Sequence, residues 1–277
     1  AKVFGGAHHL GVMARLHHPE YAAFIFLSMP FARLAELGLP CAMFLRGDDI
    51  EYCLRHVAAG GVTVSNPNLA AWHEAAHSYA QEYMSIAHGV IINMAYGQRT
   101  PDDLATFFHR RAAVHLSLSD VAGLTVYAEA LADLVACGPL LQANYVAHYL
   151  SVLTRFKGFD GAFSVMADEL VASLAESSVR AGKATVVAPF LYMDPYSGRE
   201  PLNHVVLVNT HTDRRCVYDP FEVERLAVLS GVAAQLYASL SLFIQNFDAL
   251  RDHYSQKINT TASAAFWLAE VEGKSFE

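Results

Sequence analysis

Apolar residues recur every three to four positions over most of the chain up to residue 178, a pattern that predicts a succession of helices. Turn residues bound these patterns: Gly38 and Pro40 follow the first, and Gly97 closes the longest. We expect helices over residues 21–37, 50–58, 69–96, 100–110, 121–135, 140–156 and 163–178.

The pattern changes after Gly182. Continuous Val-rich apolar runs follow, and turn residues such as Asp219-Pro220 bound them, as is typical of buried strands. We expect an α+β fold, in which a short antiparallel sheet with flanking helices follows a helical N-terminal half. The chain would divide into a helical region, 1–125, and a second module, 126–277, or form one continuous domain. The expected elements of the second module are strands over 184–192, 203–209 and 216–218, and a helical segment over 223–247.

The composition is that of a folded protein with a large core. Of its 277 residues, 53% are hydrophobic and 17% charged, and the mean hydropathy is +0.24, which excludes a disordered chain. The net charge is -8 and the 19 Lys and Arg form no basic run, so we expect no nucleic-acid partner. The longest uninterrupted apolar stretch, residues 21–29, is shorter than the roughly 18 residues of a membrane-spanning helix. We therefore expect a soluble protein with no membrane span and no secretory leader.

The cysteines argue against a disulfide framework and against a zinc ribbon. A disulfide-rich domain needs dense cysteines in a short chain, and a zinc ribbon needs paired CxxC motifs. The sequence has neither, and its four cysteines are unevenly spaced: Cys41, Cys53, Cys137 and Cys216.

A histidine and an aspartate are expected to face each other across the second and third strands. If Asn209 pairs with Arg214 across the intervening turn, the same register places His204 opposite Asp219. Opposed residues on one face of a sheet lie within reach of an imidazole–carboxylate hydrogen bond. Such a pair would supply a general base and the group that orients it. The alternative is a polar rim in which both side chains are simply exposed.

Cys137 is a candidate nucleophile because Cys137-Gly138-Pro139 is expected to open the helix over 140–156. Proline is favoured in a first helical turn, and the positive end of the helix dipole favours a thiolate. The alternative is a core cysteine beside a helix kink.

Together these features resemble the papain-like cysteine peptidase superfamily. The resemblance rests on Cys137-Gly138-Pro139 before an apolar helix, on His204 at the start of an apolar strand, and on Tyr218-Asp219-Pro220 at the end of the next. The bacteriocin-processing group and the YopT/AvrPphB type of secreted effector protease are the most similar. The resemblance implies a central helix that carries the cysteine and packs on the sheet. It also implies a Cys137 nucleophile, a His204 base and an orienting Asp219, with a protein or peptide substrate and no cofactor.

The chain departs from the family pattern before the cysteine. The family places a glutamine there for the oxyanion hole, whereas residues 129–136 contain no Gln or Asn. The backbone amides of Cys137 and Gly138 are the substitutes. Arylamine N-acetyltransferases share a similar His-to-Asp hairpin, but their Arg-Gly-Gly-x-Cys motif is absent. The resemblance therefore implies a hydrolase or an acyl transferase that acts through a thioester.

Two further functions stay open. His73-Glu74-Ala75-Ala76-His77 matches HExxH, in which two imidazoles one helical turn apart bind zinc and the glutamate polarises a water molecule. A zinc metallohydrolase would need a third ligand on a later helix, such as Glu129. The other alternative is a non-catalytic structural or assembly protein, for instance a secreted effector or a viral protein.

Overall fold

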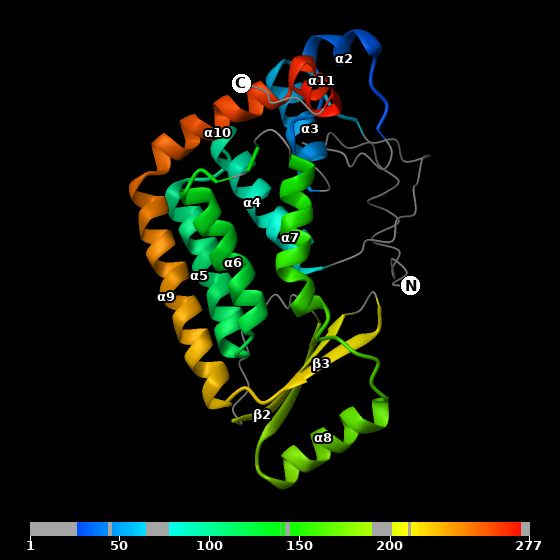
Figure 1. Cartoon of the computed structure of the whole chain (residues 1–277), viewed down its shortest axis with the longest axis vertical. Coiled ribbons are helices and arrows are strands. Elements are labelled where there is room, and N and C mark those ends of the chain that lie inside the picture. The colour runs from blue at the N-terminus through cyan, green and yellow to red at the C-terminus, as the bar shows by residue number, and fades with distance from the viewer. Residues whose placement is uncertain are drawn as a thin grey trace.

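The computed structural model describes residues 27–43, 46–64, 78–138, 140–141, 145–189, 201–209 and 212–272. Helices dominate these residues, and a small sheet lies at one end of them (Figure 1). In chain order the elements are α2 (Phe31–Leu37), α3 (Asp48–Ala58), α4 (Tyr79–Ala95), α5 (Pro101–Ser117), α6 (Val121–Val135), α7 (Tyr145–Asp160), α8 (Asp168–Arg180), β1 (Ala184–Pro189), β2 (Leu202–Asn209), β3 (Arg214–Tyr218), α9 (Val223–Gln245), α10 (Phe247–Thr261) and α11 (Ala264–Glu272). The α+β class expected from the sequence is confirmed.

Local capping explains where several helices begin. The Thr100 hydroxyl accepts the Asp103 N–H and the Asp103 carboxylate accepts the Thr100 N–H, which forms a capping box at α5. Asp120 caps α6 by accepting the Gly123 N–H. Pro30 precedes α2, which begins at Phe31, so residues 27–30 of the helix expected over 21–37 are not helical, while residues 21–26 lie outside the described residues. Proline disfavours a helical conformation in the residue before it, which explains this correction.

Helix α6 lies at the centre of the helical layer. It packs most extensively against α9 and α4, and also against α5 (Figure 1). Its apolar side chains belong to one hydrophobic core that extends from Cys41 to Ala262. A boundary at residue 125 would fall inside α6, so helices from both expected regions share this core.

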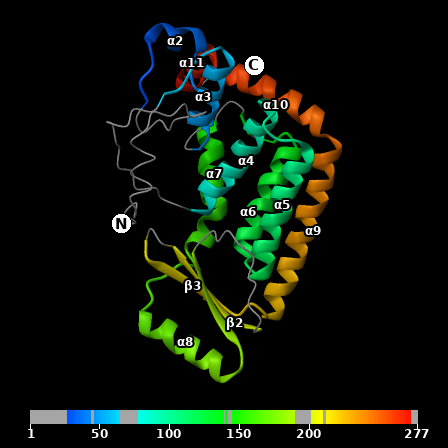
Figure 2. The same cartoon turned by 180° about the vertical axis from the view of Figure 1, so that it is seen from behind.

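The sheet has the order β1-β2-β3 and is mixed. β2 and β3 are antiparallel, as expected, but β1 and β2 are parallel, which corrects the expectation of an antiparallel sheet. Parallel neighbours require a connection of about a dozen residues, and residues 190–201 supply that length. Helix α8 packs against β1 and β2, and the helical bundle lies beyond the opposite side of the sheet (Figure 2).

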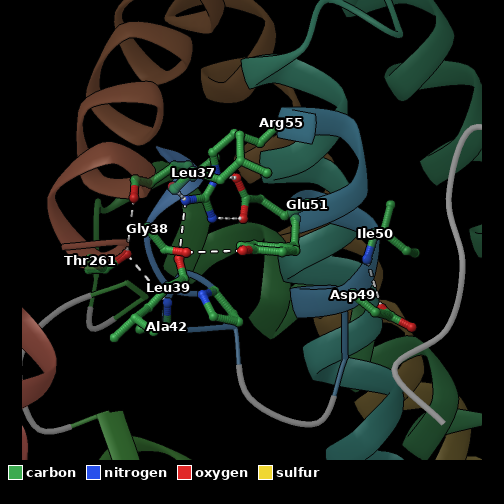
Figure 3. Close-up of polar contacts among 12 residues, drawn as sticks. Leu37, Gly38, Leu39, Ala42, Asp49, Ile50, Glu51, Arg55 and Thr261 are labelled. Carbon is green, nitrogen blue, oxygen red and sulfur yellow. Dashed lines mark hydrogen bonds and ion pairs between the residues drawn. The ribbon is translucent and has the colours of Figure 1, made fainter. Parts of the chain in front are cut away.

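A buried ion pair fastens α3 to the segment after α2. Glu51 is fully buried and accepts two hydrogen bonds from the Arg55 guanidinium, at 3.0 and 2.6 Å. Arg55 also donates to the carbonyl oxygens of Leu37 and Leu39, at 2.8 and 3.1 Å (Figure 3). The Tyr96 hydroxyl donates to Glu51 at 2.6 Å. Each oxygen of the buried carboxylate thus has a donor, as a buried charge requires.

Candidate functional site

Cys137 lies at the end of a helix and not at the start of one. Its N–H donates to the Leu134 carbonyl oxygen at 3.2 Å, beyond the last residue of α6, and its φ is 48°. The next described helix, α7, begins at Tyr145. This corrects the expectation of a helix that Cys137 opens. The C-terminal end of a helix dipole disfavours a thiolate, so the expected source of activation does not apply here.

The hairpin register predicted from the sequence is confirmed over the paired residues. Asn209 lies opposite Arg214, and the pairing continues to Val205 opposite Tyr218. β3 ends at Tyr218, so Asp219 lies one residue beyond the paired strands. The exposed Asp219 carboxylate accepts the Phe221 N–H at 2.8 Å and so serves a turn.

The imidazole of His204 is engaged on the α8 side of β2. Its Nδ1 lies 3.0 Å from Nδ2 of Asn203, which also donates to Oγ of Ser178 in α8 at 3.0 Å. Within the described ranges no hydrogen bond joins His204 to Asp219. The strand register thus extends to the residues next to His204 and Asp219, but the side chains of these two residues are hydrogen-bonded elsewhere.

Helix α6 separates Cys137 from the sheet. At its beginning, the Tyr218 hydroxyl of β3 donates to the Leu118 carbonyl oxygen at 3.0 Å. At its end, the Tyr254 hydroxyl of α10 donates to the Leu134 carbonyl oxygen at 2.9 Å. The 15 residues between rise about 22 Å at 1.5 Å per residue. The structure therefore does not bring the thiol to the sheet histidine, because direct proton transfer needs contact within about 3 Å.

The expected zinc ligands His73, Glu74 and His77 lie outside the described residues. Helix α4 begins only at Tyr79, after the extended cap residue Ser78, whereas the sequence pattern suggested a helix from residue 69. Among the described residues, no group of three or more His, Cys, Asp or Glu side chains is arranged to hold a metal ion.

Glu129, the suggested third zinc ligand, takes part in an ion-pair network. It accepts a hydrogen bond from Nη1 of Arg155 at 2.9 Å. The same nitrogen lies 3.2 Å from Asp133, which also accepts the Tyr83 hydroxyl at 2.5 Å. This network links α4, α6 and α7, so the glutamate has a structural role.

A cavity lies where the helical bundle meets the sheet. It has a volume of about 350 Å³ and is lined by the first turn of α4, the first turn of α6, the end of α7 and the segment after it, β2, β3 and the first turns of α9. Asp120 forms part of its wall, and its carboxylate accepts the Gly123 N–H at 3.0 Å and Nδ1 of His115 at 2.9 Å. A carboxylate only accepts, so Nδ1 of His115 carries the proton.

Cys216, Tyr218 and Arg225 also line the cavity. The Arg225 guanidinium lies over the Tyr218 ring, 4.0 Å from its centroid. Burial raises the pKa of the Cys216 thiol, while Arg225 lowers it and the charge of Asp120 raises it. A thiol with a raised pKa is protonated at neutral pH and is a poor nucleophile. The cavity is therefore suited to binding rather than to thiolate chemistry.

Sequence reasoning missed this cavity. In the sequence, Asp120 precedes an expected helix and Cys216 and Tyr218 belong to an expected strand, and no pattern predicts that the three share a site. Nothing in their local sequence links them, because Asp120 and Cys216 line one cavity only in the folded chain.

Helix α9 presents an apolar face on the outside of the bundle. No charged residue occurs between Arg225 and Asp248. By length and composition alone α9 could cross a membrane, and 22% of its most apolar 18-residue window is buried. Its exposed large side chains include Val228, Tyr237 and Leu242. The helix expected over 223–247 is thus present, but the expectation of no membrane span rested on uninterrupted apolar runs, and Ser, Gly and Gln residues interrupt the apolar run of α9.

Comparison of the chain with protein-family models and with curated proteins finds no match. The arrangement of the described residues is therefore the basis for assigning a function.

Proposed function

We propose that this chain is a non-catalytic assembly protein that associates with a second copy of itself through α9. The observation that carries the proposal is the 23-residue helix α9, which has no charged residue after Arg225 and lies along the edge of the bundle with most of its surface exposed (Figure 1). An exposed apolar patch of this kind marks an interaction site in a folded protein.

The outward stripe of α9 consists of small side chains. We call it the α9 stripe: Ala227, Ser230, Gly231, Ala234, Ala238 and Ser241, all exposed. The opposite stripe of the same helix is buried in the bundle and includes Leu229, Leu236 and Phe243. Small residues allow two helix axes to approach closely, so the α9 stripe is suited to another helix.

The absence of charge favours a second copy as the occupant. In a two-fold symmetric contact each patch meets itself, so a charged patch would oppose like charges. The α9 stripe avoids this repulsion. Ala234 is the central residue of Val223–Gln245, so an antiparallel pair of α9 helices would place the two Ala234 side chains near the symmetry axis.

The catalytic hypotheses have less support. The separation of Cys137 from the sheet and its position at a helix C-terminus both weigh against a Cys137–His204–Asp219 hydrolase or acyl transferase. A zinc metallohydrolase that uses His73, Glu74 and His77 stays a prediction. Zinc analysis of the purified chain tests it: about one tightly held equivalent would favour the metal site.

Charge substitutions on the α9 stripe test the assembly proposal by sedimentation equilibrium. The unmodified chain should form a dimer at micromolar concentration. Ala234→Glu should be monomeric because two carboxylates then face each other, and so should Ala234→Lys. An equimolar mixture of the two variants should restore the dimer through opposite charges. Ala172→Glu, on the exposed face of α8, is the matched control and should dimerise normally.

Two outcomes would overturn the proposal. One is a monomeric unmodified chain at 100 µM, a concentration chosen as well above about micromolar dissociation constants. The other is flotation of the chain with phosphatidylcholine vesicles, abolished by Ala234→Glu, which would indicate a lipid surface as the occupant of the α9 stripe.

Alkylation tests the hydrolase hypothesis separately. An activated Cys137 would react with iodoacetamide at pH 6 much faster than it does in the urea-unfolded chain, because only the folded site would hold a thiolate. We expect no such acceleration.

A further inference from the structure

The cavity between the bundle and the sheet has the dimensions and walls of a small-molecule site. Its volume of about 350 Å³ falls within the range of about 300–1,000 Å³ that is usual for such sites. Four aromatic rings line it: Tyr79 of α4, Phe159 of α7, Phe163 of the segment between α7 and α8, and Tyr218 of β3. Tyr79 meets Phe159 edge to face with 5.7 Å between centroids, so the rings support one another.

The charged groups of the cavity are mostly negative. Asp120, Glu222 and Glu224 contribute carboxylates, whereas Arg225 contributes the single cation among the lining residues. Arg225 is already held over the Tyr218 ring, with Nη1 3.4 Å from the Ser119 carbonyl oxygen. A positively charged guest would therefore meet an excess of negative charge.

Asp120 is the carboxylate placed to contact a guest. Its side chain is 7% exposed, and Asp120 lines the cavity. Each of its oxygens accepts one hydrogen bond within the protein, from the Gly123 N–H or from His115. A carboxylate offers about four acceptor positions, so each oxygen can accept one more.

The pKa shifts of two tyrosines that line the cavity agree with a negative electrostatic potential inside it. Burial raises the pKa of both Tyr79 and Tyr218, and the charge of Asp120 is the next cause for each. For Tyr218 the opposing effect of Arg225 is smaller than that of Asp120. The charge of Asp120 thus affects the pKa of these tyrosines more than the charge of Arg225 does.

We propose that this cavity binds a small amine with an apolar body, whose ammonium group donates to Asp120 while its hydrocarbon part packs among Tyr79, Phe159 and Phe163. Aromatic walls attract a cation through the negative faces of their rings, and burial strengthens that attraction. The site is independent of the α9 stripe and requires no association of two copies.

A matched series of ligands tests charge and shape together. The probes are 2-phenylethylamine, the neutral 2-phenylethanol and the anionic 3-phenylpropionate, each titrated into the full chain by calorimetry. The amine should bind about tenfold or more tightly than the alcohol, and the acid should bind most weakly. The amine should also slow alkylation of Cys216, which lines the cavity, while leaving the other three cysteines unaffected.

Two variants locate the binding. Asp120→Asn keeps an oxygen that can cap α6 but removes the charge, and should weaken the amine by about 10- to 100-fold with little effect on the alcohol. Ala162→Phe at the exposed rim should obstruct the cavity and weaken both ligands, whereas Ala172→Phe on α8 should change neither. Circular dichroism establishes that each variant is folded. If Asp120→Asn does not fold, Ala162→Phe and Cys216 protection still decide the result.

Equal affinity for amine and alcohol, preference for the acid, or no saturable protection of Cys216 by any probe would each overturn the proposal. A normal dimer with an empty cavity would refute only this inference, and a monomer that binds the amine would refute only the assembly proposal.

Discussion

The Tyr218 hydroxyl donates a hydrogen bond to the backbone carbonyl oxygen of Leu118, at 3.0 Å, and so joins the last residue of β3 to the turn between α5 and α6. The two residues are 100 positions apart in the sequence. Tyr254 makes the equivalent contact with Leu134 at the other end of α6. Two tyrosines thus hold both ends of the central helix, one from the sheet and one from α10.

Tyr218→Phe should destabilise the fold. It removes the donor and leaves the carbonyl oxygen of the buried Leu118 unpaired, which costs about 1–3 kcal/mol of unfolding free energy. Urea unfolding followed by circular dichroism measures the loss. Tyr237→Phe, at an exposed position of α9, is the control and should change stability by about 0.5 kcal/mol or less. Equal effects of the two substitutions would mean that the Leu118 contact contributes nothing.

Glu51→Gln should lower the free energy of unfolding by more than Tyr218→Phe does. The substitution leaves the Arg55 guanidinium, which is largely buried, without its carboxylate, and removing one member of such a pair costs about 3–5 kcal/mol. The same urea experiment measures it. Glu36→Gln disrupts the exposed ion pair with Arg33 and should cost about 1 kcal/mol or less. A Glu51→Gln protein as stable as Glu36→Gln would contradict the role given to the buried pair.

The stability of the fold should fall as the solution is acidified from pH 6.5 to pH 4. Burial lowers the pKa of His88 to about 4, although its hydrogen bond to the Arg46 carbonyl oxygen opposes the shift. The imidazole of the unfolded chain titrates near pH 6.5, so the unfolded state binds more protons between these values. The stability that depends on a neutral His88 is thus fully present above pH 6.5 and lost by pH 4. This loss lowers the free energy of unfolding by about 3 kcal/mol.

Unfolding free energies between pH 4 and pH 7 in the unmodified chain and in His88→Gln test this dependence. Glutamine keeps an N–H donor for Arg46 but does not titrate, so the variant should lose less stability on acidification. Identical slopes in the two proteins would contradict the assignment to His88.

Gly123→Ala should destabilise α6, although alanine is usually the better helix former. A Cβ at this position would lie 2.2 Å from Nδ1 of His115 and 2.4 Å from Oδ2 of Asp120. Relieving the overlap would break their hydrogen bond, and overpacking typically costs about 1–3 kcal/mol. Gly158→Ala in α7 meets no atom within 4 Å and should instead stabilise by about 0.5–1 kcal/mol. Thermal unfolding of the two variants should therefore shift in opposite directions.

The elements that local sequence signals define were predictable. Asp120 marks the beginning of α6, and Thr100 with Asp103 marks that of α5, because these caps act within four residues. The β2–β3 register followed from the turn between Asn209 and Arg214, which fixes the pairing of short strands.

Long-range placement was not predictable in the same way. The expected helix over 163–178 begins only at Asp168 because Ser164 pairs with Arg215 of β3, a contact distant in sequence. The position of Cys137 depends on the direction in which α6 crosses the bundle, and its own neighbours carry no signal for that direction. The sequence predicted a helix over α9, but it did not reveal which side of that helix would stay exposed, because this depends on packing against α6.

Three hydrogen bonds between residues 39–42 and residues 261–267 have a consequence for the order of folding. Leu39 donates its N–H to Ala262, Ala42 to the Thr261 hydroxyl, and the Trp267 indole to Pro40. During synthesis, residues 39–42 leave the ribosome more than 200 residues before these partners. Contacts between such distant segments form slowly. The α2–α3 region therefore reaches its final packing only after the last helices have been made, and until then the absence of these partners leaves it accessible to chaperones and proteases.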